Sequence, residues 1–147
     1  MTPETTVLQE VSRFAAGVRD GKVEDSILQD ARRRVTDIIG IALAASGMDP
    51  ARVVGTVVES WGGEGQASII GRDNRYPAAG VALVNGTLAH ALDYDDTHLP
   101  SVLHPSAAVV PAVLAAAEPS GSSGRDLLAA VAAGDELAVR VGMAGYD

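Results

Sequence analysis

Acidic side chains and histidines are concentrated in one short segment of the sequence, residues 93–104. The segment contains three aspartates and two of the three histidines of the chain, namely Asp93, Asp95, Asp96, His98 and His104. Carboxyl groups that lie close together raise one another's proton affinity, and a histidine beside them can exchange a proton near neutral pH. If Pro105 begins a helix, His104 stands at its N-terminus, where free backbone N–H groups favour an anion such as a substrate carboxylate. The pattern is therefore suited to general acid–base chemistry.

The aspartates allow two other interpretations. Asp93, Asp95 and Asp96 are of a residue type that commonly forms turns and caps helices, so their role could be structural. The spacing Asp93-x-Asp95-x-Thr97 also resembles the start of a calcium-binding loop. His98 stands where such a loop requires glycine, however, and no glutamate follows at the required distance. The match to a calcium loop thus fails at two positions.

The histidines also allow more than one interpretation. His98, His104 and an aspartate could together bind zinc, although they lack the paired-histidine spacing of a helical zinc site. His90 lies on an apolar helical segment, where a histidine is more often a core residue with satisfied polar atoms than a catalyst. The sequence leaves the zinc site open and favours a core position for His90.

Composition argues against several classes of protein. The chain has 147 residues, of which 47% are hydrophobic and none is cysteine, so we expect one compact unit without disulfides, cysteine nucleophiles or thiolate-bound metal. The net charge of −8 and the 3% of aromatic residues argue against binding to nucleic acid or to an anionic membrane. Any lysine chemistry would need Lys22, the only lysine. Residues 1–4 do not resemble an export signal and charges interrupt the apolar stretches, so we expect a cytoplasmic protein.

Apolar residues recur at intervals of three and four over most of the chain, which predicts an all-α, multi-helical fold. The expected helices cover about residues 7–18, 24–46, 51–61, 78–92 and 105–118, with a last helix from residue 125 onward. Residues 66–76 predict a short β-arm. Gly80 and Gly86 lie within a helix, which indicates that another part of the chain approaches closely there. Pro111 predicts a kink or a late start of its helix.

The run from Leu83 to Asp93 and on through Tyr94-Asp95-Asp96-Thr97-His98, followed by His104-Pro105-Ser106, resembles the MmgE/PrpD family. This family includes 2-methylcitrate dehydratase, cis-aconitate decarboxylase and related epimerases. The resemblance extends along the chain to three further segments, which are residues 37–40, 69–71 and 124–128.

The resemblance implies a fold, an activity and a set of site residues. The family has a large helical domain joined to a smaller lid, is usually a homodimer, and requires no metal or cofactor. Its members remove or move groups next to the carboxylates of small di- and tricarboxylic acids. By this resemblance Asp93 and His104 are the catalytic, proton-transferring or substrate-orienting residues, and Thr97 binds a substrate carboxylate together with Asp96 and His98.

The same resemblance implies that this chain offers only part of a site. We expect residues 1–147 to form the N-terminal part of the helical domain, without the lid and without a further active-site histidine and lysine. An anionic substrate needs cations, and near the motif we expect only Arg72 and Arg75 of the arm. The last two helices are apolar on nearly all sides, which indicates that they are buried inside a larger fold.

Three hypotheses follow from an incomplete site. The chain is a subunit of a lyase or isomerase that a complementary chain completes, or a small enzyme that assembles its site across a homo-oligomer. Alternatively, it is a non-catalytic binding module that keeps the helical association surface of the family. In the decarboxylase branch the histidine stands one residue closer to the threonine than His104 does to Thr97, so the spacing resembles the dehydratase-like members more closely.

Overall fold

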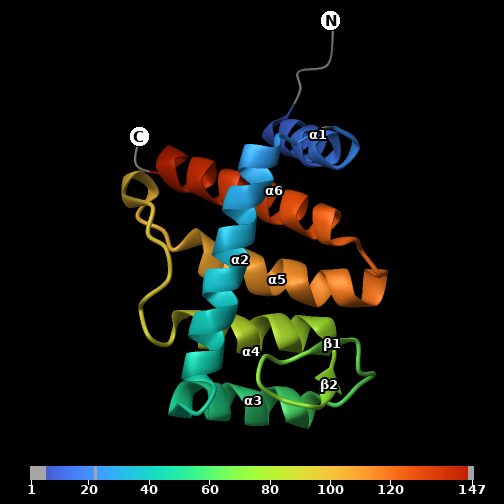
Figure 1. Cartoon of the computed structure of the whole chain (residues 1–147), viewed down its shortest axis with the longest axis vertical. Coiled ribbons are helices and arrows are strands. Elements are labelled where there is room, and N and C mark those ends of the chain that lie inside the picture. Colours follow the sequence, from blue (N-terminus) through green and yellow to red (C-terminus); the bar gives the residue numbers. More distant parts are fainter. Residues whose placement is uncertain (1–5, 22, 146–147) are drawn as a thin grey trace, which may run out of the picture.

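The computed structural model describes residues 6–21 and 23–145 (Figure 1). The predictions made on residues 1–4, on Lys22 and on the last two residues therefore lie outside the described residues. The helices are α1 (Val7–Asp20), α2 (Asp25–Ala45), α3 (Asp49–Trp61), α4 (Ala78–His90), α5 (Pro105–Ser120) and α6 (Gly124–Ala144), with a short 3₁₀ helix, η1 (Leu99–Ser101). The strands are β1 (Ala67–Ser68) and β2 (Arg75–Tyr76). The all-α prediction with a short β-arm is confirmed.

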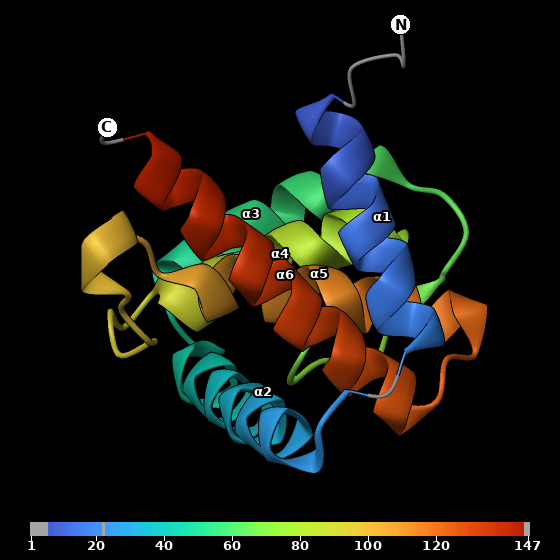
Figure 2. The same ribbon diagram turned by 90° about the horizontal axis from the view of Figure 1, so that it is seen from above.

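One helix crosses most of the others. In Figure 1, α6, α5, α4 and α3 follow one another from top to bottom, and α2 runs across them. The contacts agree, because α3 packs on α4, α4 on α5 and α5 on α6, while α2 touches α4, α5 and α6. Figure 2 shows α2 on one side of this layer and α1 resting on α6. A residue on α2 can therefore reach parts of the chain that are far apart in sequence.

The core consists of two clusters of small and branched apolar residues, both of which include α2. One cluster joins the end of α2 to α3, β1, α4 and α5 through residues such as Ala42, Val58, Val84 and Leu88. The other joins the middle of α2 to α4, α5 and α6, with Ile38, Val110 and Val131 among its buried members. Alanine allows these helices to approach closely, and the second cluster includes Ala89 and Ala107, which lie just before and just after the segment that carries the predicted site.

The β-arm is fastened to two helices. Ala67 pairs with Tyr76 and Ser68 with Arg75 in an antiparallel ladder. The buried Asn85 of α4 accepts a hydrogen bond from the Ile70 backbone at 2.9 Å, and Glu118 of α5 accepts two from Ser68 at 2.9 Å.

The arginines of the arm do not lie near the predicted site, so that expectation is wrong. Arg72 pairs with Glu59 of α3 at 2.9 Å and Arg75 with Glu118 of α5 at 3.3 Å. In Figure 1 the arm lies to the right of α4, whereas the loop that follows α4 lies to the left. The cation beside the site comes from another element, as described below.

Pro111 does not delay or end its helix. Helix α5 starts at Pro105, where proline is well tolerated because the first N–H groups of a helix have no intrahelical acceptor, and it runs through Pro111 to Ser120. The predicted late start is therefore wrong.

Among the described residues, no single helix is long and apolar enough to cross a membrane. Helices α2 and α3 pass a length and composition test only as a pair, and they are bent by 93° relative to each other.

Gly80 tests the close approach that the sequence predicts. A Cβ at this position would lie 2.6 Å from Cγ1 of Val58, a side chain that is 1% exposed. We therefore expect Gly80→Ala to lower the free energy of unfolding by about 1–3 kcal/mol through overpacking, measured by chemical denaturation.

The matched control is Gly40→Ala on α2, where a Cβ would meet nothing within 4 Å. Its higher helix propensity should raise stability by about 0.5–1 kcal/mol. Equal effects of the two substitutions would contradict the close packing of α3 on α4.

Candidate functional site

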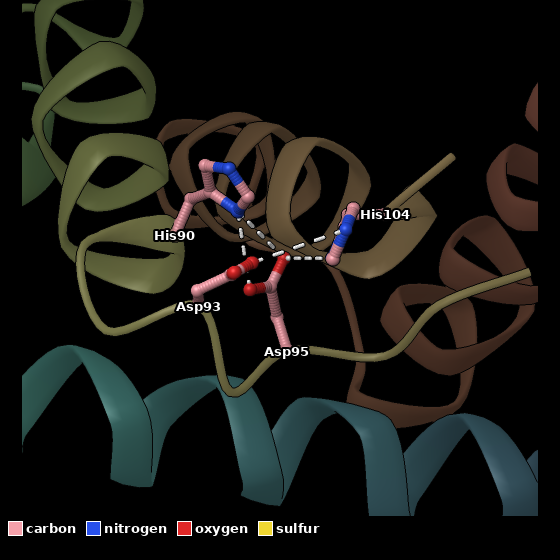
Figure 3. A group of neighbouring side chains, drawn as sticks. All are labelled: His90, Asp93, Asp95 and His104. Carbon is pink, nitrogen blue, oxygen red and sulfur yellow. Dashed lines mark hydrogen bonds and ion pairs between the residues drawn. The ribbon is translucent and has the colours of Figure 1, made fainter. Parts of the chain in front are cut away.

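Four side chains converge where α4 ends and α5 begins (Figure 3). His90 is the last residue of α4, Asp93 and Asp95 lie on the loop that follows, and His104 directly precedes α5. The Nδ1 atom of His90 lies 3.1 Å from both carboxylate oxygens of Asp95. On the other side, Nδ1 of His104 lies 3.3 Å from Asp95, and its Nε2 lies 4.0 Å from Asp93. We call these four residues the histidine–aspartate cluster.

Backbone geometry directs the loop into this arrangement. After α4 ends, the N–H of Asp93 donates to the carbonyl of His90 at 3.1 Å, and Asp93 adopts a left-handed conformation with φ of 54°. Aspartate tolerates this conformation better than most residues. Farther along, His98 and Leu103 exchange backbone hydrogen bonds of 2.8 and 3.4 Å, which close a small loop around η1. This closure brings the chain back toward α4, so that His104 faces Asp95.

The centre of the cluster is a buried carboxylate. The Asp95 side chain is 0% exposed, and its partners in the structure are the two imidazoles. The two rings stand edge to face with their centroids 5.0 Å apart. Although Nδ1 of His104 is close to Asp95, the angle is not that of a hydrogen bond, so this buried nitrogen has no hydrogen-bond partner among the described residues. Burial of a carboxylate is unfavourable unless opposite charge or hydrogen bonds compensate it. The imidazoles of His90 and His104 are the groups close enough to compensate Asp95.

A second group of charged residues fixes the loop to the helices. Arg34 of α2 forms an ion pair with Asp96 and lies 2.9 Å from Asp30 and 3.8 Å from Asp135 of α6. Burial alone would lower the pKa of Arg34, but the hydrogen bond to Asp30 and the nearby carboxylates raise it above its ordinary value. Asp96 also accepts a hydrogen bond of 3.1 Å from the backbone N–H of Ser106. Asp96 thereby caps the N-terminus of α5. His104 occupies the N-cap position of this helix, but its side chain makes no capping hydrogen bond.

Asp135 has an altered proton affinity within this group. Its side chain is 12% exposed, and Oδ1 has no hydrogen-bond partner among the described residues. Burial raises the pKa of Asp135 to about 6, and the Asp96 charge adds to this shift, whereas Arg34 and the Ser106 hydroxyl oppose it. Since one arginine faces three aspartates, its charge does not compensate all of them.

The predicted site residues divide between two depressions of the surface. Asp96, Thr97 and His98 line a cavity of about 350 Å³ together with Arg34 and Asp135. His104 instead lines an open groove of about 940 Å³, with His90 and mostly apolar residues of α4, of α5 and of the segment before α5. The structure thus brings His104 and Asp93 together and places the three predicted substrate-binding residues in the neighbouring cavity. The roles assigned to all five stay predictions.

Sequence reasoning missed three residues of the site. His90 is not a core residue as expected, because its side chain is 55% exposed and its ring borders the groove. Its position three residues before Asp93 was the available signal. Arg34 and Asp135 gave no local signal, since their relation to the loop depends on how α2 and α6 cross the other helices.

The histidine–aspartate cluster is also where a metal ion could be held. One ligand atom from each of its four residues lies within 4.8 Å of the others. The zinc site considered from the sequence differs, because Nδ1 of His98 instead lies 2.8 Å from the Ser101 hydroxyl. His90 takes the place that the sequence interpretation gave to His98.

The raised pKa of Asp135 predicts a pH-dependent stability. The pKa of Asp135 is about 6 in the folded protein and 3.8 in the unfolded chain, so folding favours its protonated form. This preference contributes fully to stability below pH 3.8. This contribution is lost as the pH rises through 6 and amounts to about 3 kcal/mol. We expect Asp135→Asn to remove that loss. As the pH rises, the free energy of unfolding of the wild type should therefore fall relative to that of the variant.

The measurement is chemical denaturation at a series of pH values from about 3 to about 7, a range that includes both pKa values of Asp135, 3.8 and about 6. The control is Asp37→Asn at an exposed position of α2, which should leave the pH dependence unchanged. Parallel curves for wild type and Asp135→Asn would contradict the prediction.

Comparison with known proteins relates the whole chain to one family. The MmgE/PrpD N-terminal domain matches residues 9–146. The cis-aconitate decarboxylase-like protein oryM of Aspergillus oryzae is 30% identical over 152 aligned positions, which cover 99% of this chain and 32% of that protein. The cis-aconitate decarboxylase of Mus musculus is 29% identical, covering 92% of this chain and 29% of the relative. The cis-aconitate decarboxylase of Homo sapiens is 30% identical, covering 85% of this chain and 27% of the relative.

The extent of these matches defines what the chain corresponds to. It spans about a third of the length of the curated relatives it matches. The family match and the helical fold agree with the resemblance carried by the segment from Leu83 to Ser106. The chain belongs to the MmgE/PrpD family and corresponds to its N-terminal domain.

Proposed function

We propose that this chain supplies the acid–base groups of a cofactor-independent lyase or isomerase that acts next to the carboxylates of small di- or tricarboxylic acids. We further propose that a second polypeptide completes the site. His104 is the proton-transferring residue, Asp93 assists it, and Asp95 positions its ring. Thr97 binds a substrate carboxylate.

The observation that carries this proposal is the buried Asp95 between two imidazoles. A carboxylate close to an imidazole stabilises the charged form of the ring. Nδ1 of His104 lies 3.3 Å from Asp95 without forming a hydrogen bond, and we assign proton exchange with a substrate to its other nitrogen, Nε2. Nearby, Asp93 lies 4.0 Å from this Nε2 and its side chain is 78% exposed. Proton removal or addition at a carbon beside a carboxylate needs such a positioned base or acid.

The names of the relatives support the substrate class. Three of them are named for cis-aconitate decarboxylase or a protein like it, and cis-aconitate is a tricarboxylic acid. Thr97 and His104 are one residue farther apart in sequence than the corresponding pair in the decarboxylase branch, which favours a dehydratase-like reaction. The names of the relatives favour decarboxylation instead. The proposal therefore extends to acid–base chemistry beside a carboxylate, which both reactions require.

The charges around the site support the need for a second polypeptide. Among the described residues that line the groove beside His90 and His104 there is no arginine. Arg34, the cation that reaches the loop, faces Asp30, Asp96 and Asp135. A substrate with two or three carboxylates is bound by cationic side chains, most effectively by arginine. In the proposed enzyme these cations come from the second polypeptide.

The test combines the chain with a second polypeptide from the same organism that carries the rest of an MmgE/PrpD fold. Conversion of cis-aconitate is followed by proton NMR, because the products of decarboxylation, hydration and isomerisation differ in their spectra. We expect turnover by the mixture only. His104→Gln should lower kcat by about 10²–10⁴-fold, since it removes a proton-transferring group.

Asp37→Asn, on the exposed side of α2, is the control and should leave kcat and KM unchanged. Turnover by the monomeric chain alone would overturn the need for a second polypeptide. An unchanged kcat in His104→Gln would overturn the acid–base role. A complete assembly that converts no carboxylic acid would favour the alternative, a non-catalytic module that keeps the helical association surface.

A further inference from the structure

We propose that Asp135 of α6 positions the loop that carries the site, by donating a hydrogen bond to the Ser106 hydroxyl, which in turn donates to Asp96. We call these three side chains the Asp135 relay. The relay is a property of this chain alone and does not rest on the proposed reaction. The inference depends on the single proton of the Ser106 hydroxyl, on the two oxygens of Asp135 and on the engagement of Arg34 elsewhere.

The Ser106 hydroxyl lies between two carboxyl groups. Its Oγ is 2.9 Å from Oδ2 of Asp96 and 3.3 Å from Oδ2 of Asp135. A hydroxyl carries one proton and two lone pairs, so it donates to one of these oxygens and not to both. Asp96 is the closer acceptor. The contact between Ser106 and Asp135 is then a hydrogen bond only if Asp135 supplies the proton.

A proton on Asp135 completes the hydrogen bonding of Ser106. Nη1 of Arg34 lies 3.4 Å from Oγ of Ser106 and donates to it. With Asp135 protonated, Ser106 accepts one hydrogen bond from each of these two groups. Its own proton then goes to Asp96, so the donor and both lone pairs of the hydroxyl are used. With Asp135 ionised, two carboxylates compete for one proton.

The surroundings of Asp135 favour its protonated form. Oδ1 is buried without a hydrogen-bond partner among the described residues, whereas Oδ2 faces Ser106, so Oδ2 is the oxygen whose proton finds an acceptor. A neutral carboxyl group tolerates a buried oxygen without a partner better than a charged one does. Arg34 does not replace the proton, because its Nη1 pairs with Asp96 and lies 3.8 Å from Asp135. The raised pKa of Asp135, about 6, agrees with this geometry.

The charged groups around Asp135 come from α2, from the loop and from α6 itself. They line the same cavity, and they are Asp30 and Arg34 of α2, Asp96 and His98 of the loop, and Glu136 of α6, which pairs with Arg140. Among the described residues, α1, α5 and η1 supply no charged group to this lining. Asp96 and Asp30 add to the raised pKa of Asp135, and Arg34 opposes it.

The relay connects α6 to the start of α5, two residues after His104. If Asp135 loses its proton, Asp96 keeps its ion pair with Arg34 and its hydrogen bond of 3.1 Å from the Ser106 backbone N–H. The loop therefore loosens and does not unfold. Because the proton is lost as the pH rises through about 6, the attachment is tight below that pH and looser above it.

The experiment follows aspartate carboxyl carbons and backbone amides of the whole chain by NMR, from about pH 3 to about pH 8. We expect the Ser106 amide to shift with the same midpoint as the Asp135 carboxyl carbon. Its hydrogen exchange, corrected for the intrinsic rate, should become about 3–10-fold faster than that of a control amide as Asp135 ionises, the effect of one hydrogen bond. The control is the amide of Ile70, which donates to the uncharged Asn85 and reports the stability of the whole fold.

The variants are Asp135→Asn and Ser106→Ala. Asparagine keeps a donor toward Ser106 but has no titrating proton, so exchange at the Ser106 amide relative to Ile70 should lose its pH dependence. Ser106→Ala removes the acceptor of the Asp135 proton, so the pKa of Asp135 should fall. A hydroxyl that only donated to ionised Asp135 would have the opposite effect, because its removal would raise this pKa. The matched control is Ser12→Ala, whose hydroxyl bonds within the exposed α1 and whose loss should change neither readout.

Three results would overturn the proposal. These are a Ser106 amide that does not follow the titration of Asp135, a pH dependence of its exchange that persists in Asp135→Asn, and a higher pKa of Asp135 in Ser106→Ala. Because the readouts concern the chain alone, they are separate from the turnover assay. Turnover without the relay would refute this inference and leave the proposed function standing, whereas the relay without turnover would do the reverse.

Discussion

A carboxylate that has lost all contact with solvent must find its compensation inside the protein, and Asp95 finds it in two imidazoles. This constraint relates the ends of two helices to each other. His90 ends α4 and His104 precedes α5, so the position of Asp95 requires both helix ends to stay close. The proton transfer that we propose for the cluster depends on this one arrangement.

The loop can hold Asp95 in place because the adjacent residue is anchored separately. Asp96 pairs with Arg34 and caps α5 through Ser106, while Asp135 of α6 approaches from the other side. Neighbouring aspartates thus have different tasks, since one faces the imidazoles and the other fastens the loop to α2 and α5.

Local patterns were sufficient to predict most of the helices and the loop, but not how the loop is held. Spacing of apolar residues located the helices, and the proximity of Asp93 to His104 follows from the short segment that joins them. His90 was misinterpreted because burial cannot be read from an apolar neighbourhood when the residue ends its helix beside an open groove. Arg34 could not be recognised at all, because its partner Asp96 lies 62 residues later and only the crossing of α2 brings them together.

The separation in sequence between Arg34 and its partners also determines when their contacts can form during synthesis of the chain. The first half of α2 leaves the ribosome well before Asp96, and Asp135 follows later still, so the guanidinium cannot acquire its full set of partners until α6 has emerged and docked. Contacts between such distant residues form slowly because a long stretch of chain must first be closed into a loop. The attachment of the loop to α2 and α6 through Arg34 is therefore completed late, whereas the partners of Asp95 lie within a few residues of it and are already present.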